Sequence, residues 1–433
     1  MTKSKLVVVW ICNFSDSELR SKLSFNKVIL DDFLRKVTGS NQRIQNSDYG
    51  VWITNAINEV KMFRDIELHV ITPHYGIVGT VQNFCMDGIY FHVYPDESFQ
   101  VWWKIKDRIG LIKNNMSFKR NRTLINHIVM SIRPDIVHFI GAENLNYSLA
   151  ALDFDKSIPV IVQLQTLVAD KRVFSSLGRH REMIRDGESR VLSRADYIFT
   201  IAKTYMDIIR HNIAPNAIFI ANKLAIGVTP DRHHTKKEFD FVYCSVDISK
   251  AADLAIESFA IAKKSHPDIT LDIIGHYSTE YKAKLDEIIN RENIEGAVFF
   301  EGRLPTHDDV MNQLKKARFA LLPLRPDLLP STIREAMSVG CPVITTLTES
   351  TPKLNAERET ILICKPNDAI DISNKMCMLL SDEQFANHIR ENAYLTVEER
   401  YDNRAIMRKT VDSYYAIYEH FHNNTPIPEK FLS

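Results

Sequence analysis

Two carboxylates, Asp327 and Glu335, stand with seven residues between them in the segment RPDLLPSTIREAMSVGCPVITT. Asp327 falls in the loop after the apolar run RFALLPL, and Glu335 falls just over one turn into a helix that we expect to begin near Ser331. Free N–H groups at a helix start attract phosphate, and carboxylates accept hydrogen bonds from sugar or ribose hydroxyls. The segment therefore suits a sugar diphosphate, with backbone donors near Pro330, Ser331 and Thr332 on the phosphates. Taken alone, the pair also fits a helix-capping Asp and a solvated Glu.

Further polar residues follow apolar runs in the first half of the chain. In PDIVHFIGAENLN we expect His138 and Glu143 where a strand opens toward a ligand, although a buried structural histidine fits His138 equally well. IVQLQTLVAD adds Gln165 at the next strand end. Asp153 and Asp155 mimic a metal-binding Asp-x-Asp pair, but they lie in a helix-to-strand loop and we interpret them as a surface pair. No GxGxxG follows a predicted strand, which disfavours a dinucleotide dehydrogenase.

The elements that position these residues are short apolar runs rich in Val and Ile, among them KLVVVWICN, IELHVITP, YIFTIA, LDIIG and CPVITT. Helix-period stretches such as GVWITNAINEVKMF and ADLAIESFAIAKKSH lie between most of them. Strands that alternate with helices indicate an α/β protein, whose parallel sheets are covered on both faces. Ligands of such sheets bind beyond the carboxyl ends of the strands.

The chain of 433 residues exceeds the size at which one hydrophobic core stops growing, so we expect two domains. The polar stretch GVTPDRHHTKKEFD, residues 227–240, is the predicted linker. We assign residues 1–226 to one Rossmann-like domain and residues 236–400 to a second, facing the first across a cleft. The helix predicted at 402–422 carries a tyrosine-rich apolar face and is expected to return to the first domain.

Composition narrows the functional class. Apolar residues make up 45% and charged residues 25% of the chain, as in ordinary globular proteins. Lys+Arg and Asp+Glu both total 54, so the global basic excess of a nucleic-acid-binding protein is missing. Six cysteines without a CxxC pair argue against a zinc site or a disulfide framework and for a reducing compartment. We interpret the start, MTKSKLVVVWICNF, as a buried strand rather than a signal peptide, and no run approaches the roughly 18 apolar residues of a membrane span. A soluble or at most peripheral cytoplasmic protein is expected.

The segment around Glu335 resembles the family 4 glycosyltransferases of the GT-B fold. Their hallmark is Glu, seven residues, Glu, then Ala-Met, a Gly and Pro-Val-Ile, and Asp327 here replaces the first Glu. The resemblance implies that Glu335 binds the donor ribose and that Asp327 meets the sugar hydroxyls. The matching positions in this chain are Asp327, Glu335, Ala336, Met337, Gly340, Pro342, Val343 and Ile344.

Other donor-side positions follow from the same resemblance. In FVYCSVDISKAADLAIESFA, Lys250 fits the family's diphosphate-binding Lys, while Ser245 stands where the family has an Arg. Arg325, beside Asp327, or Arg303 is expected to supply the missing charge. The segment Gly302, Arg303 and Leu304 corresponds to the backbone that lines the base pocket, with Gly275 expected nearby.

In the first half, SDYGVWITNAINEVK resembles the family's glycine turn and helix that face the donor phosphate, and Gly50 is the glycine that remains of the usual pair. Residues 14–48 form a long insertion, expected to carry acceptor contacts or a lid. His138 and Gly141 match the family's His-x-His-Gly, with Ile140 in place of the second His. The resemblance places His138 and Glu143 among the catalytic, acceptor-side residues.

The resemblance implies a retaining transfer of a sugar from a nucleotide-sugar donor to a glycan or lipid-linked acceptor, as in the synthesis of bacterial capsule, O-antigen or exopolysaccharide. It implies neither a metal nor a cofactor, because helix starts and Lys250 neutralise the leaving diphosphate. Residues 101–122 join Trp102 and Trp103 to several Lys and Arg, which is typical of an interfacial helix on an anionic membrane. A helix packed on the first domain with solvated lysines explains the same pattern.

Two other functions fit the sequence. The departures at Ser245, Ile140 and Asp327 favour a non-catalytic GT-B partner that binds glycan or stabilises a true glycosyltransferase. A sugar-nucleotide epimerase of similar fold is a weaker third hypothesis.

Overall fold

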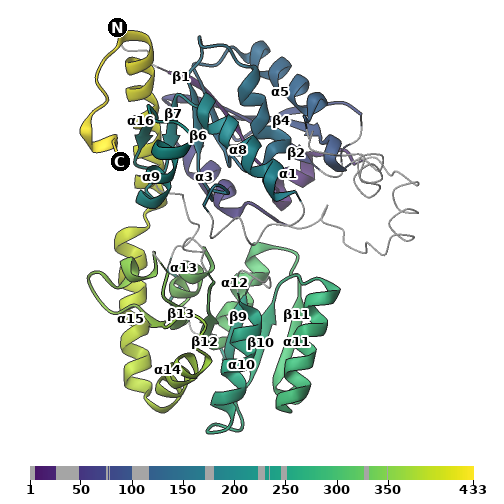
Figure 1. Cartoon of the computed structure of the whole chain (residues 1–433), viewed down its shortest axis with the longest axis vertical. Helices are drawn as coiled ribbons and strands as arrows, with labels where there is room; N and C mark the ends of the chain where they lie inside the picture. The colour runs from purple at the N-terminus through teal and green to yellow at the C-terminus, as the bar shows by residue number, and fades with distance from the viewer. Residues whose placement is uncertain are drawn as a thin grey trace. The chain divides into compact units, whose positions relative to one another are not determined.

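The computed structural model describes residues 5–25, 48–74, 77, 79–99, 117–170, 180–222, 230–233, 235–244, 251–325, 331–348 and 350–433. The chain divides into two compact units (Figure 1). The first comprises Met1–Ala225 and Asn403–Ser433, and the second comprises Ile226–Asp402.

The described part of the first unit holds one eight-stranded sheet, in the order β3-β4-β2-β1-β5-β6-β7-β8. All neighbouring strands are parallel except β3 and β4. Leu6, Val8 and Trp10 of β1 point to one face, where α3 and α16 supply apolar partners, and Val9 and Ile11 are buried on the other. The bounds are β1 (Leu6–Ile11), β2 (Ile66–His74), β3 (Gln82–Met86), β4 (Ile89–Pro95), β5 (Ile136–Ile140), β6 (Val160–Gln163), β7 (Tyr197–Phe199), β8 (Ile218–Ile220), α1 (Ser17–Lys22), α3 (Val51–Val60), α5 (Lys119–Ile132), α6 (Leu145–Ser148), α8 (Arg181–Arg194), α9 (Lys203–Asn212) and α16 (Asn403–Asn423).

The described part of the second unit holds a six-stranded parallel sheet in the order β11-β10-β9-β12-β13-β14. Phe241 and Tyr243 of β9 pack toward α10, α11 and α14, whereas Val242 and Cys244 pack toward α12 and α13. Apolar side chains thus fill both faces, as parallel sheets require. The bounds are β9 (Phe239–Cys244), β10 (Leu271–Ile274), β11 (Val298–Gly302), β12 (Ala317–Leu322), β13 (Val343–Thr346), β14 (Ile361–Cys364), α10 (Ala252–Lys263), α11 (Thr279–Glu292), α12 (His307–Lys315), α13 (Ser331–Ser338), α14 (Ala369–Ser381) and α15 (Glu383–Arg400).

The C-terminal helix α16 belongs to the first unit. Its buried side chains include Met407, Val411 and Tyr414, which join the same apolar cluster as Trp10 of β1 (Figure 1). The structure confirms the predicted α/β class, with two Rossmann-like parallel-sheet units and a C-terminal helix that packs on the first of them.

The polar stretch predicted as a linker is tied to the second unit along its described residues. The N–H of Asp231 donates to the carbonyl of Ser338 at 2.8 Å, and Nζ of Lys237 donates to the carbonyl of Lys315 at 2.8 Å. The hydroxyl of Tyr394, on α15, donates to the carbonyl of Asp231 at 3.0 Å. These bonds hold the stretch against α12, α13 and α15.

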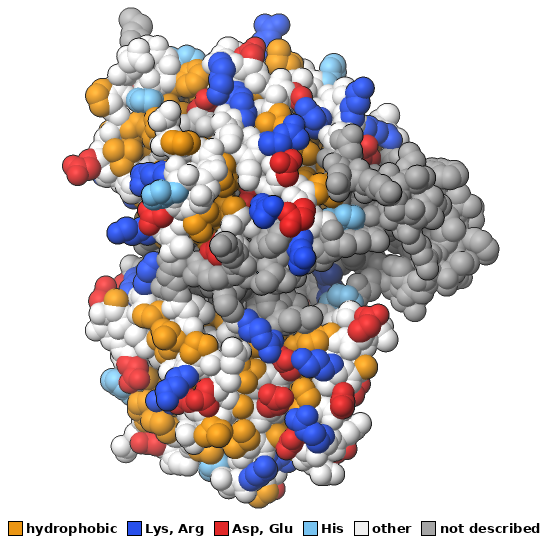
Figure 2. Space-filling model, viewed as in Figure 1, with side chains coloured by type: hydrophobic (Ala, Val, Ile, Leu, Met, Phe, Trp, Pro, Cys, Tyr) orange, Lys and Arg blue, Asp and Glu red, His pale blue; other side chains and the backbone are white. Residues whose placement is uncertain are grey.

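Charged side chains of both signs are interspersed over the described surface in the view of Figure 2, in keeping with equal totals of basic and acidic residues. Within the described ranges, no helix is both long enough and apolar enough to cross a membrane. Most of the predicted interfacial stretch, residues 101–116, lies outside the described residues. Of its basic side chains, Lys119 and Arg120 are exposed at the start of α5, and Arg122 pairs with Asp153.

Candidate functional site

The helix α13 places Glu335 on the flank of the second unit's core. Ile333, Ala336 and Met337 are buried among apolar residues, which fixes the face that α13 turns to the sheet. Glu335 is only 9% exposed, and its Oε1 lies 3.2 Å from Nε2 of His307, the first residue of α12. A carboxylate so far from water needs a partner, and His307 provides one.

The other residues predicted around this helix divide into two groups. Ser331 and Thr332 are the first two described residues of α13 and are half-buried. Asp327 and Pro330 lie outside the described residues. The chain enters this region through Leu324, whose N–H donates to Oγ1 of Thr346 at 2.8 Å.

The motif glycine Gly340 has a structural role at the end of the same helix. Its φ of +66° is left-handed, and a β-carbon there would lie 2.5 Å from Cζ of Tyr394. Nε of Arg390 donates to its carbonyl at 2.9 Å. Glycine at this position therefore lets α13 end directly beneath α15.

The segment Gly302, Arg303 and Leu304 leads from β11 into α12. The N–H of Gly275 donates to the carbonyl of Gly302 at 2.8 Å, so the two predicted glycines are neighbours at the ends of β10 and β11. Arg303 is exposed, and Leu304 packs at the edge of the apolar cluster beneath α12 and α13. The segment thus leads into α12, whose first residue, His307, contacts Glu335.

The cations expected for a diphosphate are described only in part. Lys250 and Ser245 lie outside the described residues. Arg325 donates from both terminal nitrogens to Asp253, in the first turn of α10, at 2.9 Å each, and Lys284 donates to the same carboxylate at 2.8 Å. Burial raises the pKa of Asp253, but the hydrogen bonds from Arg325 and Lys284 outweigh it and bring the pKa well below its usual range.

In the first unit, Gly50 caps α3 with a left-handed φ of +64°. A β-carbon at Gly50 would lie 2.6 Å from the carbonyl oxygen of Asn13, just after β1. Only glycine allows the start of α3 to approach the carboxyl end of β1 this closely. The predicted helix after Gly50 is therefore present, and its start lies beside the end of β1.

His138 does not lie at the open end of a strand, as we expected, but in the middle of β5, where it is 1% exposed. Nε1 of Trp10 donates to the hydroxyl of Tyr414 at 2.9 Å, and a second hydrogen bond joins that hydroxyl to Nδ1 of His138 at 2.7 Å. Burial lowers the pKa of His138 to about 3. The cavity beside it, about 20 Å³, is far smaller than a sugar-binding pocket. This corrects the expected placement of His138: its ring packs against α16.

Glu143 lies at the open end of β5, as the sequence predicts. Its Oε1 accepts a hydrogen bond from Nδ2 of Asn144 at 2.8 Å, while its Oε2 is buried and has no hydrogen-bond partner among the described residues. Burial raises the pKa of Glu143 to about 7. Gln165 contacts the same strand end, because its Nε2 donates to the carbonyl of Ile140 at 3.3 Å.

A second buried acid near this strand end was missed by sequence reasoning. Glu188 of α8 is 0% exposed and accepts hydrogen bonds from the N–H groups of Val168 and Ala169 at 2.9 and 3.0 Å. Burial raises its pKa to about 8, and the charge of Glu143 adds to the effect. The available signal was its position three residues before Val191, on the apolar face of the helix.

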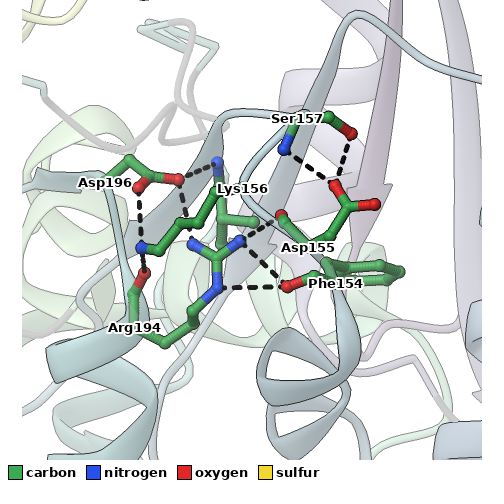
Figure 3. Close-up of polar contacts among 7 residues, drawn as sticks. Phe154, Asp155, Lys156, Ser157, Arg194 and Asp196 are labelled. Carbon is green, nitrogen blue, oxygen red and sulfur yellow. Dashed lines mark hydrogen bonds and ion pairs between the residues drawn. The ribbon is translucent and has the colours of Figure 1, made fainter.

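The Asp-x-Asp pair is structural. Asp155 accepts hydrogen bonds from the backbone N–H and the hydroxyl of Ser157, and the guanidinium of Arg194 donates to the carbonyl of Asp155 at 2.7 Å (Figure 3). Asp153 pairs with Arg122. The two carboxylates thus have different hydrogen-bond partners and do not converge on one point, as ligands of a common metal ion would. In the part of the chain that the structure describes, no group of three or more His, Cys, Asp or Glu side chains is arranged to hold a metal ion.

Comparison with known proteins gives matches concentrated in the second unit. Residues 231–396 match the family described as glycosyl transferases group 1. N-acetyl-alpha-D-glucosaminyl L-malate synthase of Bacillus anthracis is 24% identical over 131 residues, which cover 30% of this chain and 34% of that protein. An uncharacterized glycosyltransferase of Haemophilus influenzae is 22% identical over 151 residues, 35% of this chain and 41% of that protein. The matches thus span well under half the length of these relatives.

Solved structures match over nearly the whole chain. A sucrose-phosphate synthase of Thermosynechococcus elongatus has a TM-score of 0.70 at 12% identity, covering 95% of this chain and 99% of its own. Anabaena HepE in complex with UDP and glucose has a TM-score of 0.63 at 14% identity, covering 94% and 99%. At such low identity these likenesses show the fold, which is that of the GT-B glycosyltransferases.

Proposed function

We propose that this chain, whose residues 231–396 match the group 1 glycosyl transferases, transfers a sugar from a nucleotide-sugar donor to an acceptor hydroxyl. The observation that carries the proposal is Glu335. It is a carboxylate only 9% exposed, on the flank of α13, which the structure describes from Ser331 onward. A buried acid beside free helix N–H groups is suited to a ligand that carries both hydroxyls and phosphates.

On the donor side, Glu335 accepts hydrogen bonds from the ribose, and the N–H groups of Ser331 and Thr332 meet the diphosphate. The segment Gly302 to Leu304 packs the base. Lys250 and Asp327, outside the described residues, take the diphosphate and the sugar hydroxyls in this proposal. UDP is the first nucleotide to test, because HepE, which shares the fold, binds UDP and glucose.

Transfer breaks the bond between the anomeric carbon and the diphosphate oxygen, forms a bond from the same carbon to the acceptor oxygen, and passes the proton of the acceptor hydroxyl to a base. We assign no metal to this step, because helix N–H groups and cations are sufficient to stabilise the leaving diphosphate. Retention of anomeric configuration is what the resemblance to the family 4 glycosyltransferases implies. Glu143 is the acceptor-side residue of the proposal, since an acid with a pKa of about 7 at a strand end can exchange a proton near neutral pH. The buried ring of His138 is not given a catalytic role.

The acceptor in this proposal is a glycan or a lipid-linked glycan of a bacterial surface polysaccharide, met at the cytoplasmic face of the membrane. The residues that suggest the membrane surface are Trp102, Trp103 and the basic side chains around them. Co-sedimentation with anionic and with neutral vesicles tests this part. Equal binding to both kinds of vesicle, or none, would remove the membrane from the proposal.

The reaction is tested by turnover of UDP-, GDP- and ADP-sugars, followed as nucleoside diphosphate release. We expect release by the wild type to persist in EDTA, to disappear in Glu335→Ala, and to be unchanged in Glu287→Ala, an exposed acid on α11. NMR of the product is expected to show the donor's anomeric configuration. Wild-type turnover by Glu335→Ala, in a protein that is folded, would end the proposal.

A non-catalytic GT-B partner protein is the second candidate function. The residue that favours it is Ser245, which leaves the family's diphosphate cation position without a charge. Such a protein is expected to bind no nucleoside diphosphate at millimolar concentration, whereas the enzyme does.

A further inference from the structure

The contact between His307 and Glu335 joins two helices of the second unit. Nε2 of His307 lies 3.2 Å from Oε1 of Glu335, and the two side chains are 20% and 11% exposed. The distance is that of an ion pair when the imidazole is protonated. The contact therefore links α12 to α13 through the imidazole of His307 and the carboxylate of Glu335.

His307 is held in place by the start of its own helix. The hydroxyl of Thr306 accepts a hydrogen bond from the N–H of Asp309 at 3.1 Å, and the carboxylate of Asp309 accepts one from the N–H of Thr306 at 3.1 Å. This capping box fixes the first turn of α12. The ring of His307 therefore projects toward α13 from a rigid support.

The charged residue that precedes Glu335 in the chain, Arg334, is directed toward another residue. Arg334 lies over the ring of Tyr401, with its guanidinium carbon 5.5 Å from the ring centroid. Of the two carboxylate oxygens of Glu335, Oε1 is the one that faces His307. The carboxylate is thus held from one side by the imidazole.

We propose that His307 is a positioning residue, which holds the carboxylate of Glu335 in the orientation that binds the ribose hydroxyls of the donor. The inference rests on the proposed function, in which Glu335 binds the donor. If the side chain of Glu335 rotated freely, the donor would have to fix its orientation, and the lost conformational entropy would weaken binding. A carboxylate that His307 already holds does not carry this cost. His307 acts through Glu335 and does not itself touch the donor.

A double-mutant cycle on the full chain tests this inference. Isothermal titration calorimetry with UDP, and with GDP and ADP beside it, gives Kd for the wild type, His307→Ala, Glu335→Gln and the double variant. In the wild-type background we expect His307→Ala to raise Kd about tenfold. In the Glu335→Gln background we expect the same substitution to change Kd by less than about twofold. Because His307 acts on binding, we expect KM for the nucleotide-sugar to rise while kcat stays near that of the wild type.

Two further variants separate positioning from a merely structural role. His307→Gln places an amide N–H near the position of Nε2, so its Kd is expected to stay within about threefold of the wild type. His388→Ala, an exposed histidine on α15, is the matched control and is expected to leave Kd unchanged. If His307→Ala does not fold, the cycle is measured with His307→Gln and His307→Asn, and Asn, which is too short, is expected to bind more weakly than Gln.

The outcomes separate the inference from the function on which it rests. A wild type that binds none of the three nucleotides overturns the proposed function together with the role of His307. If the wild type binds but His307→Ala binds equally well, only the positioning role is wrong. The positioning role is also wrong if His307→Ala weakens binding by the same factor in the wild-type background and in the Glu335→Gln background.

Discussion

The hydroxyl of Tyr414 joins the C-terminal helix α16 to the sheet of the first unit. Tyr414→Phe is therefore expected to destabilise that unit. The Tyr414 hydroxyl accepts a hydrogen bond from Nε1 of Trp10 at 2.9 Å and shares another with Nδ1 of His138 at 2.7 Å. Trp10 and His138 are both 1% exposed, so neither has ready access to water after the substitution. Phe keeps the ring and removes only the oxygen.

The magnitude follows from the two polar groups that lose their partner. Each buried donor or acceptor without a partner costs about 1–3 kcal/mol, so we expect the free energy of unfolding of the first unit to fall by about 2–6 kcal/mol. Tryptophan fluorescence in denaturant isolates this unit, because all four tryptophans of the chain, at positions 10, 52, 102 and 103, lie within it.

Tyr90→Phe is the matched control. Tyr90 is 40% exposed, and its hydroxyl makes no hydrogen bond to a described residue. Its loss is expected to change the free energy by less than about 0.5 kcal/mol. If Tyr414→Phe has an effect as small as the control, the network through Trp10 and His138 does not anchor α16 and the reasoning is wrong.

Three further substitutions test other parts of the account. Gly340→Ala forces a side chain into a left-handed backbone position and against Tyr394, so hydrogen exchange should show the second unit destabilised by about 2–4 kcal/mol. Gly296→Ala is the control and should show little change, because a β-carbon there meets nothing within 4 Å. Asp253 has a lowered pKa in the folded chain, so its contribution to stability is present above its ordinary pKa of 3.8 and is lost as the pH falls below that value. Asp253→Asn should reduce this loss of stability at acid pH. If the dependence of stability on pH is unchanged, the ion pair does not stabilise the second unit. Glu143 has a pKa raised from 4.5 to about 7, so it contributes stability to the first unit that is lost as the pH rises between these values. Glu143→Gln should remove this contribution in tryptophan-monitored unfolding and leave the part due to Glu188, whose pKa is raised to about 8.

Much of the fold was predictable because buried parallel strands have a strong sequence signal. Runs such as LVVVWI of β1 are apolar throughout, since both faces of the sheet are covered. The strand β3 was missed because QNFCM lies at the sheet edge and is only partly buried. The signal that would have found it is Asp87-Gly88, whose positive φ values of 50° and 81° form the tight turn between β3 and β4.

The site was predictable as a motif and only partly as geometry. Helical spacing placed Glu335 correctly on α13, but no sequence pattern relates it to His307, which comes 28 residues earlier on another helix. The ion pair of Arg325 with Asp253 joins residues 72 positions apart and is equally invisible in the sequence. His138 was misplaced because an apolar run does not reveal how far beyond a histidine its strand continues.

The central claim is that the second unit binds a nucleoside diphosphate through Glu335. Isothermal titration calorimetry of the full chain with UDP, GDP and ADP, for the wild type and for Glu335→Gln, tests it most directly. We expect at least one of the three to bind the wild type with a Kd below millimolar, and Glu335→Gln to weaken that binding by at least about tenfold. No binding of any of them at millimolar concentration, or equal Kd for both proteins, would contradict it.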